Sequence, residues 1–327
     1  MPGGFTSAVG AIITNGADRG SGVPGVDRPA TDGHGNGHRN GNGRLADWPV
    51  TDVSLTAAPR DQDIMAGGCF ARSLPLDPTC AGAARRYFRE AVADTDLPAD
   101  LIHDGVTMAS ELAANTLNAH GNVEYARGGQ RPVSGIPEIW VYLRSHRFGM
   151  ELVCKVFDSD PAWEEFEPAA EGAMGKARWD SVRGRGLQLV AGLSANHWGH
   201  HPTRGRLGAW KVPGKAVWFA LRVPPASQLC RLARPAHRGS AAIEALASSL
   251  ADRGIGDGLI GVAAQRGDIA VLSVSHRLTV WSHGDTLAWT APDGGHERLS
   301  SVDLVEAAER IVCAYETLTE GGHPEPS

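Results

Sequence analysis

The pattern of apolar and polar residues predicts an α/β protein in which order begins near Cys69. Apolar residues at helical spacing predict three helices, over 77–93, 98–120 and 186–194. Apolar runs of strand length predict five strands, over 69–76, 139–144, 150–158, 209–212 and 215–223. Together these elements predict a two-layer α/β sandwich, with helices on one side and a mixed or antiparallel sheet on the other.

A second, smaller pattern follows the prolines at 224–225 and predicts an α+β unit of unknown role. Its expected elements are helices over 240–253 and 302–318 and strands over 267–274, 278–281 and 286–289. Trp281 and Trp289 are expected in its core or on its sheet face. The predicted divisions of the chain are therefore 1–64, 65–225 and 226–327.

The amino-acid composition further predicts a disordered N-terminal tail and a cytoplasmic location. Residues 1–64 are rich in Gly, Asn, Asp and Pro, and such a segment buries too little apolar surface to offset its ordering entropy. The 327 residues carry a formal charge of -6, which gives no support for a nucleic-acid partner. No apolar run spans a bilayer, and the five scattered cysteines favour a reducing compartment. A cytoplasmic protein without a membrane partner is expected.

The helix predicted over 98–120 carries a polar stripe beside its apolar face. Glu111, Asn115, Asn118 and Asn122 follow one another at spacings of four, three and four, which places them on one side of a helix. Asn is a poor helix former, so the stripe is unusual. It fits either a polar pocket or an ordinary solvated face.

Two further segments carry chemistry that fits a nucleotide. Asp158 ends an apolar strand, where a carboxylate can accept a hydrogen bond from an amino group of adenine or simply start a turn. The segment 183–190, Arg-Gly-Arg-Gly-Leu-Gln-Leu-Val, runs from glycines into an apolar helix. Backbone N–H groups at such a helix start suit phosphate oxygens, although a lone Gly-x-Gly usually marks only a loop.

Taken together, the three segments resemble the ATP-site motifs of the histidine-kinase-like ATPases, which share the Bergerat fold. The nearest branch resembles the actinobacterial anti-sigma-factor serine kinases. Glu111-Leu-Ala-Ala-Asn115 is similar to its Glu-x-x-x-Asn motif, and the segment 184–199 is similar to its Gly-x-Gly-Leu helix ending in Trp-Gly. The segment 214–221 is similar to its closing strand. The resemblance covers about 69–224 and leaves out both the tail and the C-terminal unit.

The resemblance implies a role for each motif residue. Glu111 would be the catalytic base, Asn115 would hold Mg²⁺, and Asp158 would bind the adenine of ATP. The segment 161–183 would be the lid over the nucleotide and is expected to be a mobile loop. The remaining residues implied to bind the nucleotide are Asp160, Arg183, Gly184, Arg185, Gly186 and Leu187.

Three functions stay open at this point. The first is an ATP-dependent protein serine/threonine kinase that acts on an anti-anti-sigma-type partner. The second is a nucleotide-dependent module that sequesters a sigma factor or another partner with little turnover. Two departures from the family pattern favour this second function: Asp160 stands where the family has glycine, and Ala216 stands where it has threonine. The third is an interaction scaffold that binds no nucleotide. A homodimer through the C-terminal unit is also left open.

Overall fold

The computed structural model describes residues 63–126, 136–159, 182–207, 211–256, 260–266 and 269–320. For 118–126, 182–185, 260–266 and 320 it describes the backbone alone. All but the last two residues of the tail predicted over 1–64 lie outside these ranges. Ile64 is buried at the start of the short 3-10 helix η1 (Ile64–Ala66).

The first sheet is antiparallel throughout and has the strand order β1-β2-β3-β5-β4. Its apolar character explains why the sequence predicts most of it, because β2 and β3 are buried along nearly their whole length. The strands are β1 (Cys69–Ser73), β2 (Glu138–His146), β3 (Gly149–Asp158), β4 (Trp198–Arg204) and β5 (Pro213–Arg222).

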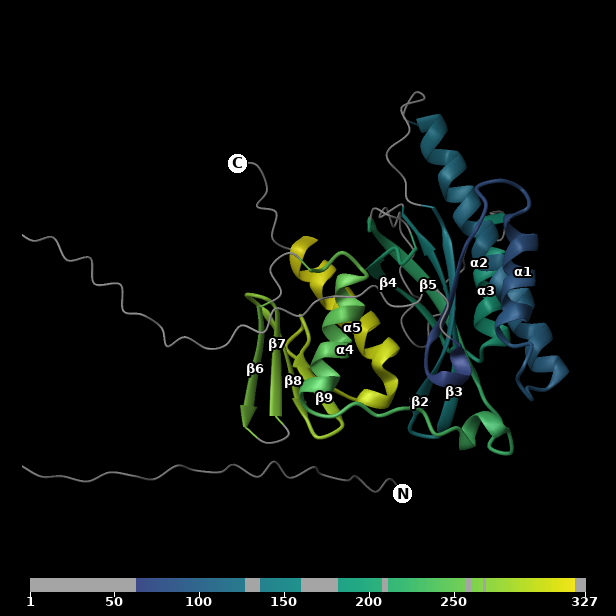
Figure 1. Ribbon diagram of the computed structural model, residues 1–327. Helices are drawn as coiled ribbons and strands as arrows, with labels where there is room; N and C mark the ends of the chain where they lie inside the picture. Colours follow the sequence, from purple (N-terminus) through teal and green to yellow (C-terminus); the bar gives the residue numbers. More distant parts are fainter. Residues whose placement is uncertain are drawn as a thin grey trace, which may run out of the picture. The chain divides into compact units, whose positions relative to one another are not determined.

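Three helices cover one face of this sheet, as Figure 1 shows: α1 (Cys80–Ala91), α2 (Ala99–Ala126) and α3 (Val182–Leu193). Alternate residues of β2, such as Ile139 and Val141, pack beneath these helices. The apolar face of α2 is also buried here, including Val106 and Ala109. Gly105 lets α1 and α2 approach closely, because a β-carbon at that position would meet the ring of Phe88 at 2.3 Å.

The opposite face of the first sheet is covered by a helix from the C-terminal part of the chain. α5 (Leu304–Glu320) contacts β4 and β2, and Val305 packs against a cluster that contains Trp140 and Tyr142. Trp140 and Tyr142 alternate along β2 with the residues under α2. Both faces of the central strands are therefore buried, and the α/β sandwich has a further helical layer behind its sheet.

The C-terminal part forms a second antiparallel sheet with the order β10-β9-β8-β7-β6. α4 (Ser240–Ala251) packs on this sheet and on α5 (Figure 1). Trp289 is buried in this core and Trp281 lies exposed on the sheet, as the sequence predicts. The strands are β6 (Ile260–Arg266), β7 (Ile269–Ser275), β8 (Leu278–His283), β9 (Thr286–Thr290) and β10 (His296–Ser300).

The strand predicted over 209–212 is wrong in its described part, because Lys211 and Val212 lie outside any strand. Residues 209 and 210 lie outside the described ranges. The fifth strand of the sheet is instead β4, which pairs with β5 at the sheet edge. β6 and β10 are also additional to the predicted elements. The resulting fold is mixed α/β with two antiparallel sheets.

The structure bears on the state of the cysteines and on membrane-spanning helices. All five cysteines are free thiols, and Cys69, Cys80 and Cys154 are buried. None of the helices that the structure describes is long and apolar enough to cross a membrane.

Candidate functional site

Glu111 and Asn115 lie one turn apart on α2, and both side chains are half-buried. Their neighbours Leu112 and Ala113 point into the core and fix the rotation of the helix. The amide nitrogen Nδ2 of Asn115 is buried, and no hydrogen-bond partner for it is present among the described residues. A buried donor without an acceptor costs about 1–3 kcal/mol, so this nitrogen needs an acceptor that the described residues do not supply.

Helix α3 brings Gly186 directly against these two side chains. A β-carbon at position 186 would lie 2.8 Å from Oε2 of Glu111 and 3.6 Å from Nδ2 of Asn115. The structure thus joins two segments that the sequence separates by some 70 residues. Leu187 packs against the core beside them and anchors this end of α3.

The glycines of the 183–190 segment lie inside α3, which is a correction to the expected turn before a helix. α3 begins at Val182, so Gly184 and Gly186 belong to its first two turns. The close approach to Glu111 gives the physical reason for glycine at 186, because any side chain there would displace the carboxylate. The backbone N–H groups of the first helical turn remain suited to an anion.

Asp158 ends β3 and is 2% exposed. It alternates with Val156 and Cys154, so it lies on the face of the sheet that α2 and α3 cover. Its carboxylate Oδ2 is 3.6 Å from Nζ of Lys215 on the neighbouring strand β5. Gly214 permits this close pairing, since a β-carbon there would meet the carbonyl oxygen of Asp158 at 2.3 Å.

Several predicted site residues cannot be placed in this arrangement. Asp160 and residues 161–181 of the expected lid lie outside the described ranges, and Arg183 and Arg185 are described only as backbone in α3. Ala216 can be placed, and it belongs to the cluster on the opposite face of the sheet, beside Phe157 and Val305. The side chain at 216 therefore points away from the face that carries Asp158.

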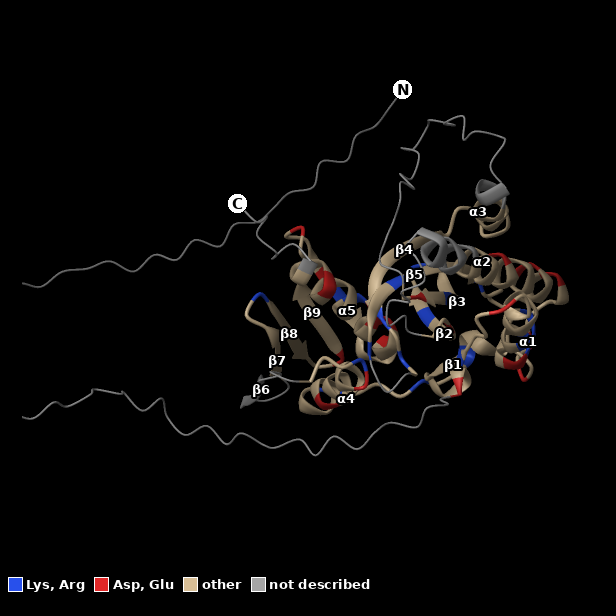
Figure 2. Cartoon of the chain, turned by 90° about the horizontal axis from the view of Figure 1, so that it is seen from above, with Lys and Arg blue, Asp and Glu red and all other residues tan. Residues whose placement is uncertain are grey.

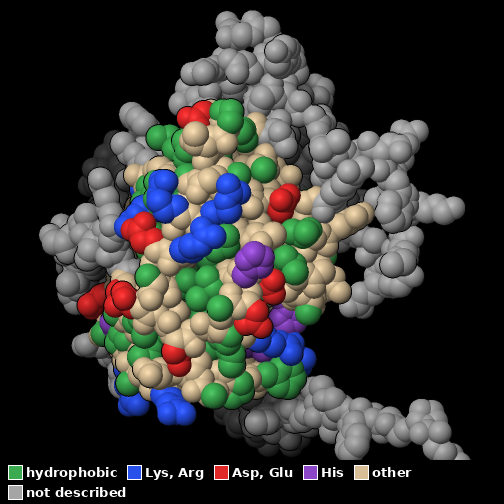
Figure 3. Space-filling model, turned by 90° about the vertical axis from the view of Figure 1, so that its right-hand side faces the viewer, with side chains coloured by type: hydrophobic (Ala, Val, Ile, Leu, Met, Phe, Trp, Pro, Cys, Tyr) green, Lys and Arg blue, Asp and Glu red, His purple; other side chains and the backbone are tan. Residues whose placement is uncertain are grey.

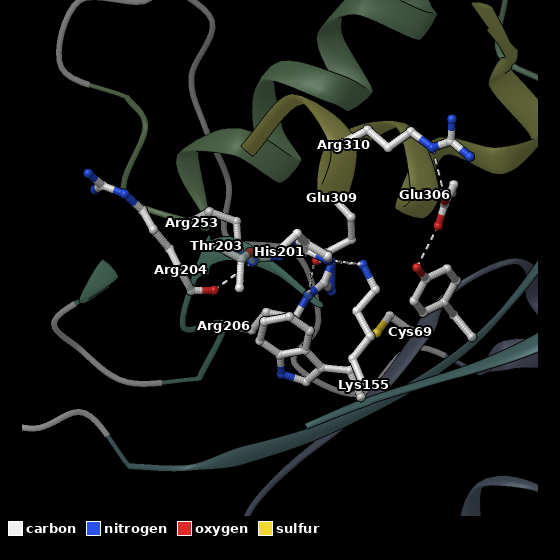
Figure 4. A network of polar contacts seen from close by, with 12 residues as sticks. Cys69, Lys155, His201, Thr203, Arg204, Arg206, Arg253, Glu306, Glu309 and Arg310 are labelled. Atoms are coloured by element: carbon white, nitrogen blue, oxygen red, sulfur yellow. Dashed lines mark hydrogen bonds and ion pairs between the residues drawn. The ribbon is translucent and has the colours of Figure 1, made fainter. Parts of the chain in front are cut away.

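A buried charge network that the sequence patterns do not predict lies on that opposite face, as drawn in Figure 4. Glu309 of α5 accepts from Nη1 of Arg253 and pairs with Lys155 of β3, whose Nζ is 3.3 Å away. Lys155 also donates to Nε2 of His201 at 2.9 Å. Arg253 extends the network to the hydroxyl of Thr203 at 2.7 Å. Figure 2 shows acidic and basic positions gathered where α5 meets the first sheet.

A neighbouring cluster surrounds Glu306, one turn earlier on α5. Glu306 accepts hydrogen bonds from the Tyr142 hydroxyl at 2.6 Å, from Arg310 at 2.8 Å and from Arg144 at 3.0 Å. Burial alone would raise the pKa of Glu306, but Lys155, Arg144 and Arg310 overcome it and lower the pKa to about 2. The pKa of Glu309 is lowered in the same way, by Arg253 and Lys155 against the effect of burial. Both carboxylates are ionised at neutral pH.

Lys155 inside the apolar strand 150–158 and Glu306 and Glu309 inside the apolar helix 302–318 are the sequence signal for this network. The signal gives no pairing, because Lys155 and Glu309 lie 154 residues apart and Arg253 and Glu309 lie 56 residues apart. Comparison of the sequence with protein-family models and with curated proteins gives no match.

Proposed function

We propose that this chain is an ATP-binding regulatory protein with a Bergerat-type site, and that it acts as a serine kinase on a protein partner. The observation that carries the proposal is the contact of Gly186 on α3 with Glu111 and Asn115 on α2. A carboxylate and a carboxamide then face the second turn of α3, next to the first turn of the same helix. That combination suits a magnesium-bound phosphate and a hydroxyl nucleophile.

The described residues fit ATP and Mg²⁺ in three respects. The carboxamide oxygen of Asn115 is a ligand type that Mg²⁺ accepts, and its buried Nδ2 offers a hydrogen bond that a phosphate oxygen could accept. The first turn of α3 offers backbone N–H groups to further phosphate oxygens. Asp158 offers a buried carboxylate on the same face of the sheet.

Glu111 and Asp158 are the two residues to which we assign a chemical role. Bound ATP with Mg²⁺ supplies an activated phosphoryl group whose charge is partly neutralised. Glu111 would accept the proton from a serine hydroxyl of the partner, and the half-buried position on α2 holds its carboxylate in place. Asp158 would accept from the amino group of adenine and so would select ATP over GTP. An anti-anti-sigma-type protein is the partner proposed for a kinase.

The second function, a nucleotide-dependent module that sequesters a sigma factor or another partner, uses the same residues without turnover. The ion pair of Asp158 with Lys215 engages the adenine-binding carboxylate in either function, so it does not separate the two. The position of Ala216 on the opposite face removes one of its two sequence arguments.

One experiment separates these functions. The full chain is incubated with and without ATP and Mg²⁺, its bound partner is identified by mass spectrometry, and phosphate transfer to that partner is followed with labelled ATP. A kinase gives ATP-dependent capture and serine phosphorylation that Glu111→Gln abolishes, with ATP binding retained. Capture without transfer supports the binding module. If ATP neither binds nor raises the melting temperature, both functions are excluded.

A further inference from the structure

A cavity formed by the described residues lies on the side of the first sheet that faces α5. It has a volume of about 750 Å³ and is bounded by the sheet, by α5 and by the turn 291–295 that joins β9 to β10. This volume is within the range of small-molecule sites, roughly 300–1,000 Å³. The cavity does not involve Glu111, Asn115 or Gly186, which lie on the other side of the sheet.

Aromatic and apolar side chains form much of its wall. Trp218 of β5 lines it from the first sheet, with the guanidinium of Arg144 5.2 Å from the centroid of its ring. Trp289 of β9, which is 3% exposed, lines it from the second sheet, and Pro292 and Ala314 add further apolar surface. Indole rings bind planar aromatic bodies by stacking and edge contacts, and they attract cations through the electron density of their faces. The walls therefore fit a flat ring system that carries positive charge.

The floor of the cavity is fixed by the ion network described above. Lys155, Glu306 and Glu309 reach it, and each is held by at least two charged or hydrogen-bonding partners. Polar groups held in this way need no rearrangement when a ligand enters, which lowers the entropic cost of binding. Burial together with Lys155 lowers the pKa of His201 to about 3, so this histidine at the cavity wall is neutral.

The charge at the outer end of the cavity favours a cation, whereas Glu309 at the inner end is already neutralised by Arg253 and Arg206, which do not line the cavity. Four carboxylates reach the cavity against three basic side chains, Arg144, Lys155 and Arg310. At the outer end, Glu297 accepts from Arg310 through Oε2 at 2.7 Å, which leaves its other oxygen for a ligand. Asp293 uses Oδ1 to accept from the backbone of Gly295 at 2.8 Å and likewise keeps one oxygen. Two acceptors thus lie beside the aromatic wall.

From these observations we propose that the cavity between the first sheet, α5 and the β9–β10 turn is a second binding site, specific for a small planar aromatic cation. The ring system lies along the Trp218 and Trp289 side of the cavity, and Glu297 and Asp293 meet the positive charge. The site does not depend on the proposed ATP site, because the two lie on opposite faces of the first sheet and share no side chain.

The test uses 9-aminoacridine, a flat three-ring cation, and anthracene-9-carboxylate, an anion with a ring system of the same size. Calorimetry on the full chain is expected to show one saturable site for the cation, with at least tenfold weaker binding of the anion. Cys313 lines the cavity and is half-buried, so the bound cation should slow its alkylation by iodoacetamide. Cys230, also half-buried but outside the cavity wall, is the internal reference.

Two threonines on α5 give a matched pair of variants. Thr317 lines the cavity and Thr319 does not, both are exposed, and each hydroxyl donates to the carbonyl four residues earlier. Thr317→Trp should fill the cavity and weaken 9-aminoacridine binding at least tenfold, whereas Thr319→Trp should leave it unchanged. ATP with Mg²⁺ should not displace the cation. Equal binding of cation and anion, binding insensitive to Thr317→Trp, or displacement by ATP would overturn the proposal, as would no binding at all.

Discussion

Gly186 of α3 lies so close to Glu111 of α2 that a β-carbon at position 186 would come within 2.8 Å of the carboxylate oxygen Oε2. Real β-carbons do not approach an oxygen this closely, so a side chain at 186 would move the carboxylate. Because the obstructing atom is the end of a flexible side chain, the backbone would not have to move. A substitution at 186 can therefore move the carboxylate of Glu111 without destabilising the fold.

Gly186→Ala should impair phosphate transfer without lowering stability. Alanine is favoured over glycine within a helix by about 1 kcal/mol, so the melting temperature should stay equal or rise. Displacement of the base should slow transfer to the partner by about tenfold to 100-fold. Thermal unfolding and labelled-ATP transfer measure the two effects on the same preparation.

Gly192→Ala is the matched control, since it lies in the same helix and a β-carbon there meets nothing within 4 Å. It should share the gain in stability and keep full transfer. If Gly192→Ala slows transfer as much as Gly186→Ala, the effect comes from helix rigidity and not from Glu111.

Asp158→Ala should reduce ATP affinity by about 10- to 100-fold, because a hydrogen bond to a charged group contributes about 1.5–3 kcal/mol. The substitution also removes the ion pair with Lys215, so a loss of affinity alone would not identify the cause. Lys215→Met removes the same ion pair and keeps the carboxylate. ATP binding that survives Lys215→Met and fails in Asp158→Ala, measured by calorimetry, would assign the adenine contact to Asp158; equal losses would refute it.

A basic surface lies on α1, outside the candidate site, where a protein partner with acidic side chains could bind. α1 presents Arg85, Arg86 and Arg89, all exposed. Figure 3 views the side of the molecule on which α1 and α2 lie and shows basic side chains gathered on part of it. The chain as a whole is acidic, so this local excess of positive charge would not have been found from the net charge of -6.

The sequence predicts those parts of the fold whose apolar pattern is long and regular. β2 and β3 are found because both faces are buried, which gives each strand a central apolar run, 139–143 in β2 and 152–157 with one lysine in β3. β4 is missed because its sequence, Trp-Gly-His-His-Pro-Thr-Arg, has no alternation. As an edge strand it tolerates Pro202, and its place in the sheet depends on pairing with β5 and on contacts with α5.

The candidate site shows the same limit. The four-residue spacing of Glu111 and Asn115 places them on one helix face without knowledge of the fold. The approach of Gly186 and the pairing of Asp158 with Lys215 depend on tertiary packing, and spacing along the chain does not encode them. The network of Lys155, Glu309 and Arg253 is encoded least of all, because it joins β3 of the first sheet to α5 and to the turn that follows α4, three segments far apart in the sequence.

Glu309→Gln should destabilise the protein strongly. Glu309 is 1% exposed and is the common partner of Arg253 and Lys155, so the substitution leaves buried positive charge without compensation. Breaking such a pair from one side costs about 3–5 kcal/mol. Urea unfolding of the wild type and the variant measures the loss. The double variant Glu309→Gln, Arg253→Met should lose less than the sum of the two single variants, and strict additivity would show that the two residues do not interact.

His201 should make the protein less stable as the pH falls from 6.5. In the folded state burial and Lys155 lower its pKa from 6.5 to about 3, and the hydrogen bonds agree, since Nε2 accepts from Lys155 while Nδ1 lies 3.0 Å from the carbonyl of Pro202. Between these two pH values the unfolded chain binds a proton that the folded chain does not. The stability that the neutral His201 contributes is therefore complete above pH 6.5 and is lost as the pH falls toward 3, by at most about 1.4 kcal/mol per pH unit for this one group.

Urea unfolding at pH 7, 6, 5 and 4 should show a shallower decline of the unfolding free energy for His201→Asn than for the wild type. His276→Asn, in an exposed turn between β7 and β8, should follow the wild-type curve; a decline in His201→Asn as steep as in the wild type would assign the pH dependence to other groups.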